Sequence, residues 1–184
     1  MPKKLPRIGA HTPTSGGMAK RSLGYAETIQ AEAIQVFTSN PRGWATPEPN
    51  PAADEEFRTK AAAMDIATYV HAPFLINLGS PTEGTYKNSL NSTAYSLRRG
   101  KDIGALGVVI HTGSAVDASH VDNAWKQIHE GMMPILEALD EDSPSLLLEP
   151  TAGQGQSLVK KLDDLEYYLK ALEYHPNVGI CLDT

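Results

Sequence analysis

The chain has 184 residues, 41% of them hydrophobic, and a formal net charge of −6. This length and composition predict one globular domain with a substantial core. The negative charge argues against a protein that coats nucleic acid through a broad basic surface. The sequence has no run of about 18 apolar residues that would cross a membrane and no apolar secretion segment near its start, so we expect a cytoplasmic protein. A single cysteine, Cys181, excludes an intrachain disulfide.

Segments typical of strands and of helices alternate along the chain. Short apolar or β-branched runs predict the strands, and the longer segments between them predict helices. Prolines at 47, 49 and 51 place the start of the second helix near Asp54, because proline blocks a helix interior. The expected strands cover 7–11 and 34–38 and then end at 71, 111, 149 and 183; the expected helices run from the turn at 14–17 to about 32, then over about 54–64, 85–104, 119–139 and 158–173.

This alternation predicts an α/β fold with a parallel sheet and right-handed crossovers. A closed (β/α)8 TIM barrel needs about 250 residues and eight strands. The chain supplies about six strands and five helices and ends one residue after the last strand. We therefore expect residues 1–184 to form a single, incomplete TIM-barrel domain. An open doubly wound sheet of six strands is the alternative architecture.

Four of the expected strands end in a residue that can bind a metal: His71, His111, Glu149 and Asp183. One such residue alone is more often a hydrogen-bonded group at a strand end. In a parallel barrel, however, the carboxyl ends of all strands share one rim, which holds the chemistry. Two imidazoles and two carboxylates on that rim predict a divalent-metal site. His11 ends the first strand on the same rim, where we expect it to support the ligands or contact substrate.

Several segments resemble endonuclease IV, the metal-dependent apurinic/apyrimidinic endonuclease family of base-excision repair. They follow the order of the family along the whole chain, and Leu-Ile-Asn-Leu-Gly and Thr-Ala-Gly-Gln-Gly are the most specific. The chain departs from the commoner family pattern at Thr112 and Pro150, which adjoin expected ligands without removing them. The matching segments are 8–11 with 16–17, 37–44, 71–79, 111–114, 149–155 and 179–184.

The resemblance implies a TIM barrel with three zinc ions that hydrolyses the phosphodiester on the 5′ side of an abasic site in double-stranded DNA. It implies that His71, His111 and Glu149 bind one zinc. Glu149 would also bind a second zinc, together with Asp183. Because it bridges the two ions, Glu149 would be the central catalytic residue. Imidazoles and carboxylates suit zinc, and a close pair of ions activates water and neutralises charge on the attacked phosphate.

The resemblance also assigns a DNA-binding role to Arg42, Phe74 and Leu75, which would enter the duplex at the lesion. A guanidinium and apolar wedges can support a base stack while the damaged nucleotide is extruded. The remaining ligands of the family pattern lie beyond Thr184. We therefore expect these 184 residues alone to bind at most one zinc well and to be inactive, and the complete protein to be a monomer that does not bind membranes.

Two other functions stay open at this point. Metal-dependent sugar isomerases and epimerases of the same barrel class also hold a divalent ion with Glu and Asp at the ends of strands five and six. The carboxylates alone do not separate these enzymes from a nuclease, although the segments 40–44 and 75–79 favour DNA. The other possibility is an inert truncated product that binds metal poorly.

Overall fold

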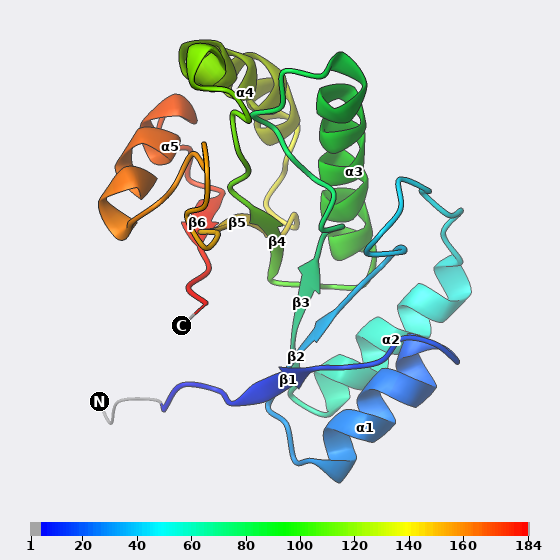
Figure 1. Cartoon of the computed structure of the whole chain (residues 1–184). Helices are drawn as coiled ribbons and strands as arrows, with labels where there is room; N and C mark the ends of the chain where they lie inside the picture. The colour runs from blue at the N-terminus through cyan, green and yellow to red at the C-terminus, as the bar shows by residue number, and fades with distance from the viewer. Residues whose placement is uncertain (1–4, 184) are drawn as a thin grey trace.

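Six parallel strands form one sheet, and their order in space follows their order in the sequence (Figure 1). The computed structural model describes residues 5–183. A sequential strand order is that of a TIM-barrel wall, whereas a doubly wound sheet reverses its order partway. The predicted incomplete barrel is confirmed and the doubly wound alternative is wrong. The strands are β1 (Gly9–His11), β2 (Ala33–Val36), β3 (Ala67–His71), β4 (Gly107–His111), β5 (Ser145–Glu149) and β6 (Val178–Ile180).

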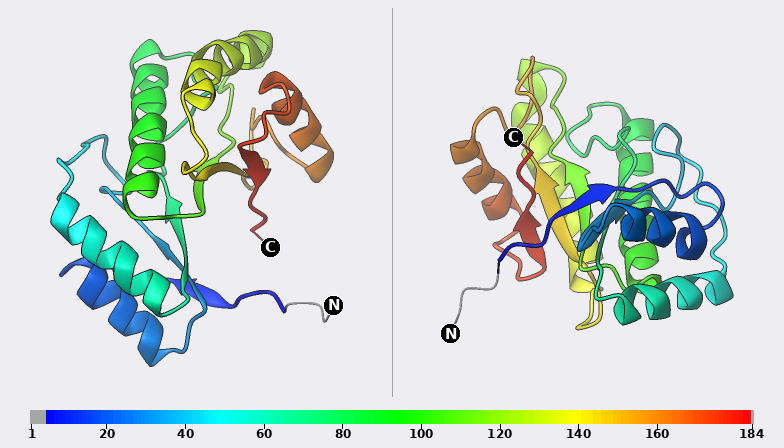
Figure 2. Two further views of the ribbon diagram at one scale, coloured as in Figure 1. Left: turned by 180° about the vertical axis from the view of Figure 1, so that it is seen from behind. Right: turned by 90° about the horizontal axis from the view of Figure 1, so that it is seen from below.

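The helices lie on the outer, convex face of this sheet, and β1 and β6 are its two edges (Figures 1 and 2). The alternation predicted from the sequence is confirmed, although the first helix ends earlier and the fifth is shorter than expected. No helix within residues 5–183 is long and apolar enough to cross a membrane. The helical segments are a π-helical turn (Met18–Ser22), α1 (Leu23–Thr28), α2 (Pro51–Ala63), α3 (Glu83–Asp102), a 3-10 turn (Ala118–His120), α4 (Val121–Glu137), a second 3-10 turn (Leu162–Asp164) and α5 (Leu165–Ala171).

Helix α2 begins at Pro51, three residues before the predicted start near Asp54. The side chain of Asn50 caps the helix by accepting a hydrogen bond from the amide of Ala53 at 3.2 Å. Proline is well tolerated at the first helical position, because its missing N–H would have no intrahelical partner there. The prediction was wrong because it treated Pro51 as a barrier to the helix when it is the first residue of the helix.

Alternate side chains of the strands form the core. The outward-facing residues of β2, β3, β4 and β5 are buried under the helices; they are Ile34, Val36, Val70, Val108, Ile110, Leu146 and Leu148. The inner face of the sheet borders a hollow of about 530 Å³ that Gln35, Tyr69 and Cys181 help to line.

Cys181 follows β6 and is half-buried. Burial, together with the negative charges of Glu149 and Asp183, raises the pKa of its thiol.

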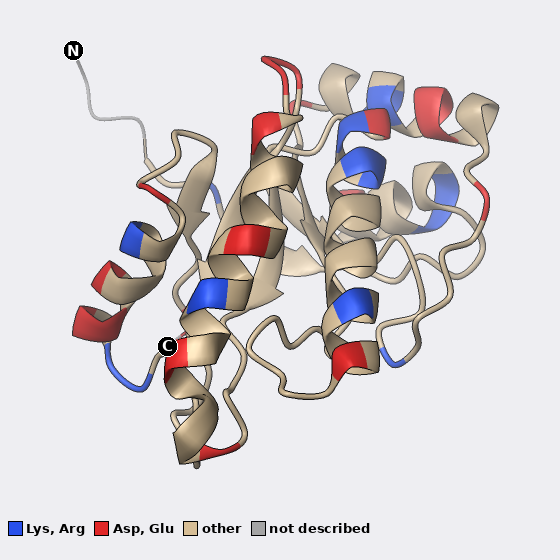
Figure 3. Ribbon diagram, turned by 90° about the horizontal axis from the view of Figure 1, so that it is seen from above, with Lys and Arg blue, Asp and Glu red and all other residues tan. Residues whose placement is uncertain are grey.

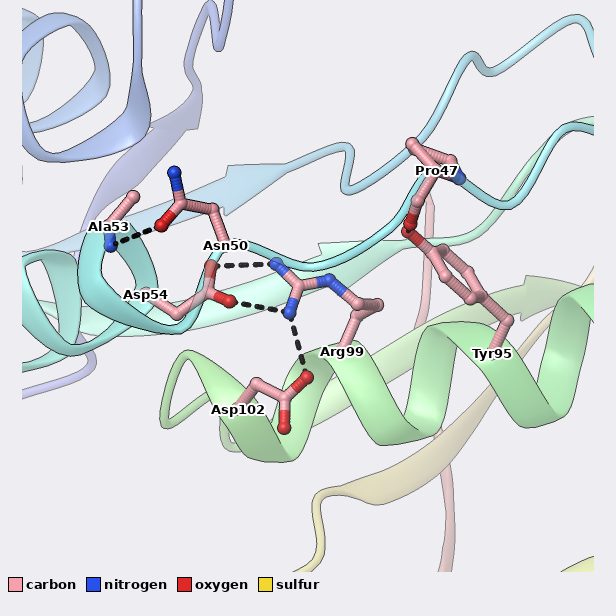
Figure 4. A network of polar contacts seen from close by, with 7 residues as sticks. All are labelled: Pro47, Asn50, Ala53, Asp54, Tyr95, Arg99 and Asp102. Atoms are coloured by element: carbon pink, nitrogen blue, oxygen red, sulfur yellow. Dashed lines mark hydrogen bonds and ion pairs between the residues drawn. The ribbon is translucent and has the colours of Figure 1, made fainter.

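A buried polar network joins α3 to the chain segment that precedes and begins α2 (Figure 4). Arg99 of α3 donates hydrogen bonds to Asp54 and to Asp102 at 2.7 Å. One helical turn away, the hydroxyl of Tyr95 donates to the carbonyl of Pro47 at 2.8 Å. These contacts hold the loop between β2 and α2 against α3.

Candidate metal centre

Three adjacent strands bring His71, His111 and Glu149 together on the carboxyl rim of the sheet. His111 and Glu149 are register partners in β4 and β5, while His71 is paired with Val109 of β4. One ligand atom of each residue lies within 4.8 Å of the other two. Four ligands were expected from the sequence, and the structure brings these three into one cluster.

The distances within the cluster fit a tetrahedral metal ion. Nε2 of His71 lies 3.2 Å from Oε2 of Glu149, and Nε2 of His111 lies 3.7 Å from the same oxygen. Zinc bonds of about 2.0–2.2 Å place two tetrahedral donors about 3.3–3.6 Å apart. The two imidazole–carboxylate separations therefore lie close to those of a tetrahedral zinc site, and the ligand atoms of all three residues lie within 4.8 Å of one another.

The hydrogen bonds of His71 leave its metal-binding nitrogen available. Its Nδ1 lies 2.6 Å from the carbonyl oxygen of Ala72 and donates to it, so the neutral ring carries its lone pair on Nε2. That lone pair faces a Glu149 oxygen, and two acceptors at this distance repel each other unless a cation or a proton lies between them. A carbonyl behind a ligating imidazole is also the usual partner that fixes the ring in metal sites.

Burial lowers the pKa of His111, and the neighbouring His71 adds to this effect, while the charges of Glu149 and Asp183 oppose it. A lowered pKa keeps the imidazole neutral at pH 7, which is the form that binds metals. The donor set of two imidazoles and one carboxylate is thus suited to zinc in its chemistry as well as its spacing.

Asp183 lies outside this cluster. The prediction that it ends the sixth strand is wrong, because β6 ends at Ile180 and pairs with β5 only over Val178–Ile180. The edge strand has a partner on one side alone, so the chain leaves the sheet early. Asp183 is exposed, yet its charge acts on His111, which places it near the rim. Its role as a ligand stays a prediction.

Aromatic rings surround the two imidazoles. The ring of Phe74 lies nearly parallel to that of His111, with centroids 5.7 Å apart and planes at 20°. Phe37 lies between His11 and His71, at centroid distances of 4.5 Å and 5.5 Å. His11 also lies 3.0 Å from the side-chain oxygen of Gln35 through Nδ1. His11 therefore contacts the ligands only through Phe37 among these rings, a role that was not expected from the sequence.

The three predicted DNA-binding residues are all exposed on rim loops. Phe74 and Leu75 are 45% and 38% exposed, and Arg42 is also exposed. The amide of Phe74 donates to the carbonyl of Pro41 at 2.9 Å, and the amide of Arg42 donates to the side chain of Asn40 at the same distance. These bonds place Arg42 next to Phe74 along the rim, close to the imidazole cluster.

Charges of both signs are interspersed along the helices in the view of Figure 3. Several of them form pairs on the helix surface, including Lys60 with Glu56 and Lys87 with Glu83, both at 2.6 Å. Within residues 5–183, the helices seen in this view therefore do not form a broad positive surface for a polyanion.

A parallel barrel wall with a histidine and glutamate cluster on its carboxyl rim defines the chain as a TIM-barrel protein with a candidate metal centre. The family described as "Xylose isomerase-like TIM barrel" matches residues 23–184, and the chain belongs to this family. Its relatives include two proteins named "Probable endonuclease 4". One, from Streptomyces avermitilis, is 53% identical over 96% of this chain, and the other, from Streptomyces coelicolor, is 52% identical over 98% of it.

A solved structure supports the same relationship. The crystal structure of endonuclease IV from Thermus thermophilus matches 97% of this chain with a TM-score of 0.80 and 28% sequence identity. The resemblance to endonuclease IV seen in the sequence is thereby confirmed. The chain spans 57% and 62% of the length of the two Streptomyces relatives and 62% of the Thermus protein.

Proposed function

We propose that the chain belongs to a zinc-dependent endonuclease that cleaves double-stranded DNA on the 5′ side of abasic sites in cytoplasmic base-excision repair, and that the complete protein is a monomer. The observation that carries this proposal is the metal-ligand geometry of His71, His111 and Glu149 beside the exposed Phe74. The similarity to endonuclease 4 proteins supports it. We further propose that the 184 residues alone are inactive.

In this proposal, His71, His111 and Glu149 hold one zinc ion. A bound zinc lowers the pKa of water and neutralises charge on a phosphate oxygen. Oε2 of Glu149 faces both imidazoles. Glu149 and Asp183 together would hold a second ion. Phe74 stacks on His111. Its ring would therefore hinder the approach of water and substrate from the side of the cluster that it covers.

Arg42, Phe74 and Leu75 recognise the lesion in this proposal. The bond from Phe74 to the carbonyl of Pro41 joins their two loops, so the guanidinium and the apolar pair enter the duplex together. Inserted side chains of this kind replace lost stacking while a nucleotide is extruded, and an abasic site offers the least resistance because no base must be unpaired. The mixed surface charges favour this local mode of recognition over general DNA coating.

A second candidate function is the isomerisation or epimerisation of a sugar. The hollow on the inner face of the sheet has a volume of about 530 Å³ and is lined in part by His11 and Gln35. A concave site of this size with a few polar groups suits a small polar molecule. The exposed Phe74 and Leu75 beside the metal ligands favour a macromolecular substrate instead.

Two assays separate the candidates. The 184-residue chain, loaded with zinc, is titrated with a duplex that carries one synthetic abasic site and with the intact duplex; we expect it to bind the abasic duplex more tightly without nicking either one. A chimera that adds the remaining part of the Streptomyces avermitilis relative should nick the abasic duplex alone. Ketose–aldose turnover by the chimera without nicking would overturn the proposal, and a chain that binds neither zinc nor DNA would favour the inert product.

A further inference from the structure

The rim loops that follow β3, β4 and β5 are joined to one another by hydrogen bonds. The side-chain oxygen Oδ1 of Asn77, in the loop after β3, accepts from the amide of Ser114 at 2.9 Å and from the amide of Gly79 at 3.2 Å. Ser114 in turn forms an antiparallel bridge with Ser157 in the loop after β5. Three loops, each following a strand that ends in a candidate ligand, thus form one connected layer.

The backbone around Asn77 is packed too closely for larger residues. A Cβ atom on Gly113 would lie 2.6 Å from Oδ1 of Asn77, and Gly113 has a φ of +74°, a conformation that glycine adopts readily. A Cβ atom on Gly79 would lie 2.7 Å from Leu158 and 3.0 Å from the carbonyl of Ser114. Because Gly79 and Gly113 lack side chains, the loops after β3 and β4 can approach closely. Oδ1 of Asn77 then accepts hydrogen bonds from the amides of both Gly79 and Ser114.

This contact lies close to the candidate ligands. Ser114, the closer of the two donors to Asn77, is three residues after His111. His111 is the most exposed of the three ligands, since its side chain is 30% exposed while those of His71 and Glu149 are 9% and 13% exposed. Less of its surface is fixed by packing, so its position depends more on the loop that follows it.

We propose that Asn77 is a positioning residue of the metal centre, which fixes the loop after His111 by accepting the Ser114 and Gly79 amide hydrogens. This inference rests on the proposed metal-binding function, to which it adds a residue that holds the His111 ligand in position. Asn77 does not have to touch the ion or the substrate. Partners of metal-ligating residues outside the ligand set affect metal affinity by about 10- to 100-fold when they are removed.

The test compares Asn77→Ala, Asn77→Asp and the wild-type 184-residue chain. Zinc affinity is measured by competition with a chromophoric chelator, and the geometry by the visible absorption spectrum of the Co²⁺ form. Asn77→Ala should lose about tenfold in zinc affinity and show an altered cobalt spectrum. Asn77→Asp keeps the accepting oxygen, so it should retain most of the wild-type zinc affinity and keep the spectrum.

Asn50→Ala is the matched control, because Asn50 also accepts a backbone amide through its side chain, but at the start of α2. It should leave zinc affinity unchanged. Gly113→Ala should reproduce the effect of Asn77→Ala, since the added methyl group would displace the Asn77 side chain. Hydrogen exchange of the metal-free wild-type chain should show a protected Ser114 amide, a result that does not depend on any variant folding.

Several results would overturn the inference. They are wild-type zinc affinity and an unchanged cobalt spectrum in Asn77→Ala, an equal loss in the Ala and Asp variants, or an unprotected Ser114 amide. A wild-type chain that binds no zinc would instead contradict the proposed metal centre itself. The two failures are therefore distinguishable.

Discussion

The guanidinium of Arg99 donates to both carboxylate oxygens of Asp54 at 2.7 Å, and both side chains are only 6% exposed (Figure 4). The two hydrogen bonds to Asp54, together with the one to Asp102, raise the pKa of Arg99 further above its ordinary value despite the opposing effect of burial. The guanidinium is therefore charged at any pH at which the protein folds. This pair joins two helices on the outside of the sheet and holds the start of α2, next to the loop that carries Arg42.

Removing the carboxylate of this pair should destabilise the chain strongly. Asp54→Ala leaves the buried Arg99 with only Asp102, and loss of one partner from a buried pair costs about 3–5 kcal/mol in the free energy of unfolding. Urea unfolding of the purified chain measures the change. Lys87→Ala, which breaks the exposed pair with Glu83, is the control and should change stability by less than about 1 kcal/mol. Equal effects of the two variants would show that the buried pair has no special role.

The three-residue cluster predicts that the 184-residue chain binds one zinc ion tightly. Glu149→Gln keeps the shape of the side chain but removes its charge, and we expect zinc affinity to fall by more than about 100-fold, the upper range for loss of a supporting partner. Asp183→Asn should reduce it only slightly, because Asp183 lies outside the cluster. Metal analysis after dialysis and chelator competition measure both. Three tightly held ions per chain, or equal losses in the two variants, would contradict this assignment.

Arg42→Ala should weaken binding to abasic DNA while zinc content stays normal. A lost side-chain contact with the bases costs about 1–3 kcal/mol, which corresponds to roughly 5- to 150-fold in affinity. Fluorescence anisotropy with abasic and intact duplexes measures the loss of discrimination. Arg98→Ala removes an equal charge from the exposed surface of α3 and should leave the preference intact. Loss of zinc from Arg42→Ala would mean that its loop has been placed incorrectly.

The open edges of the sheet should make a polypeptide of these 184 residues self-associate. β1 and β6 each pair on one side only, and the exposed Ile8 and Ile180 lie at these edges, with 76% and 43% of their surface accessible. Unpaired strand edges are templates for association, and charged residues on them oppose it. Sedimentation velocity should show concentration-dependent oligomers that decrease in the Ile8→Lys, Ile180→Lys double variant. A wild-type chain that stays monomeric over a wide range of concentrations would contradict this expectation.

The sequence predicted the positions of His71, His111 and Glu149 on one rim because each follows a buried apolar run, and parallel strands bring such ends together. The sequence could not predict the end of β6. This edge strand pairs with β5 over three residues only, Val178–Ile180, so Asp183 lies beyond the end of the strand. The start of α2 could have been predicted, because Asn50 followed by Pro51 is a regular helix start.

The roles of Phe37 and Asn77 illustrate what periodicity cannot reveal. Each contacts residues from another strand or loop, at distances fixed only by the folded backbone. The sequence contained a signal for Asn77, since it lies within the Leu-Ile-Asn-Leu-Gly segment that supported the resemblance to endonuclease IV. Its contact with Ser114 depends on the folded loops, where Gly113 leaves room for the Asn77 side chain.

The register of β4 and β5 has a consequence for folding. His111 is paired directly with Glu149, and in a strand a shift of one residue turns every side chain to the opposite face. A chain in which β5 joined β4 one residue out of place would carry Glu149 on the wrong side of the sheet and could not complete the cluster. Zinc would therefore stabilise correctly paired chains alone, so that the ion would select the native strand alignment before it takes part in any reaction.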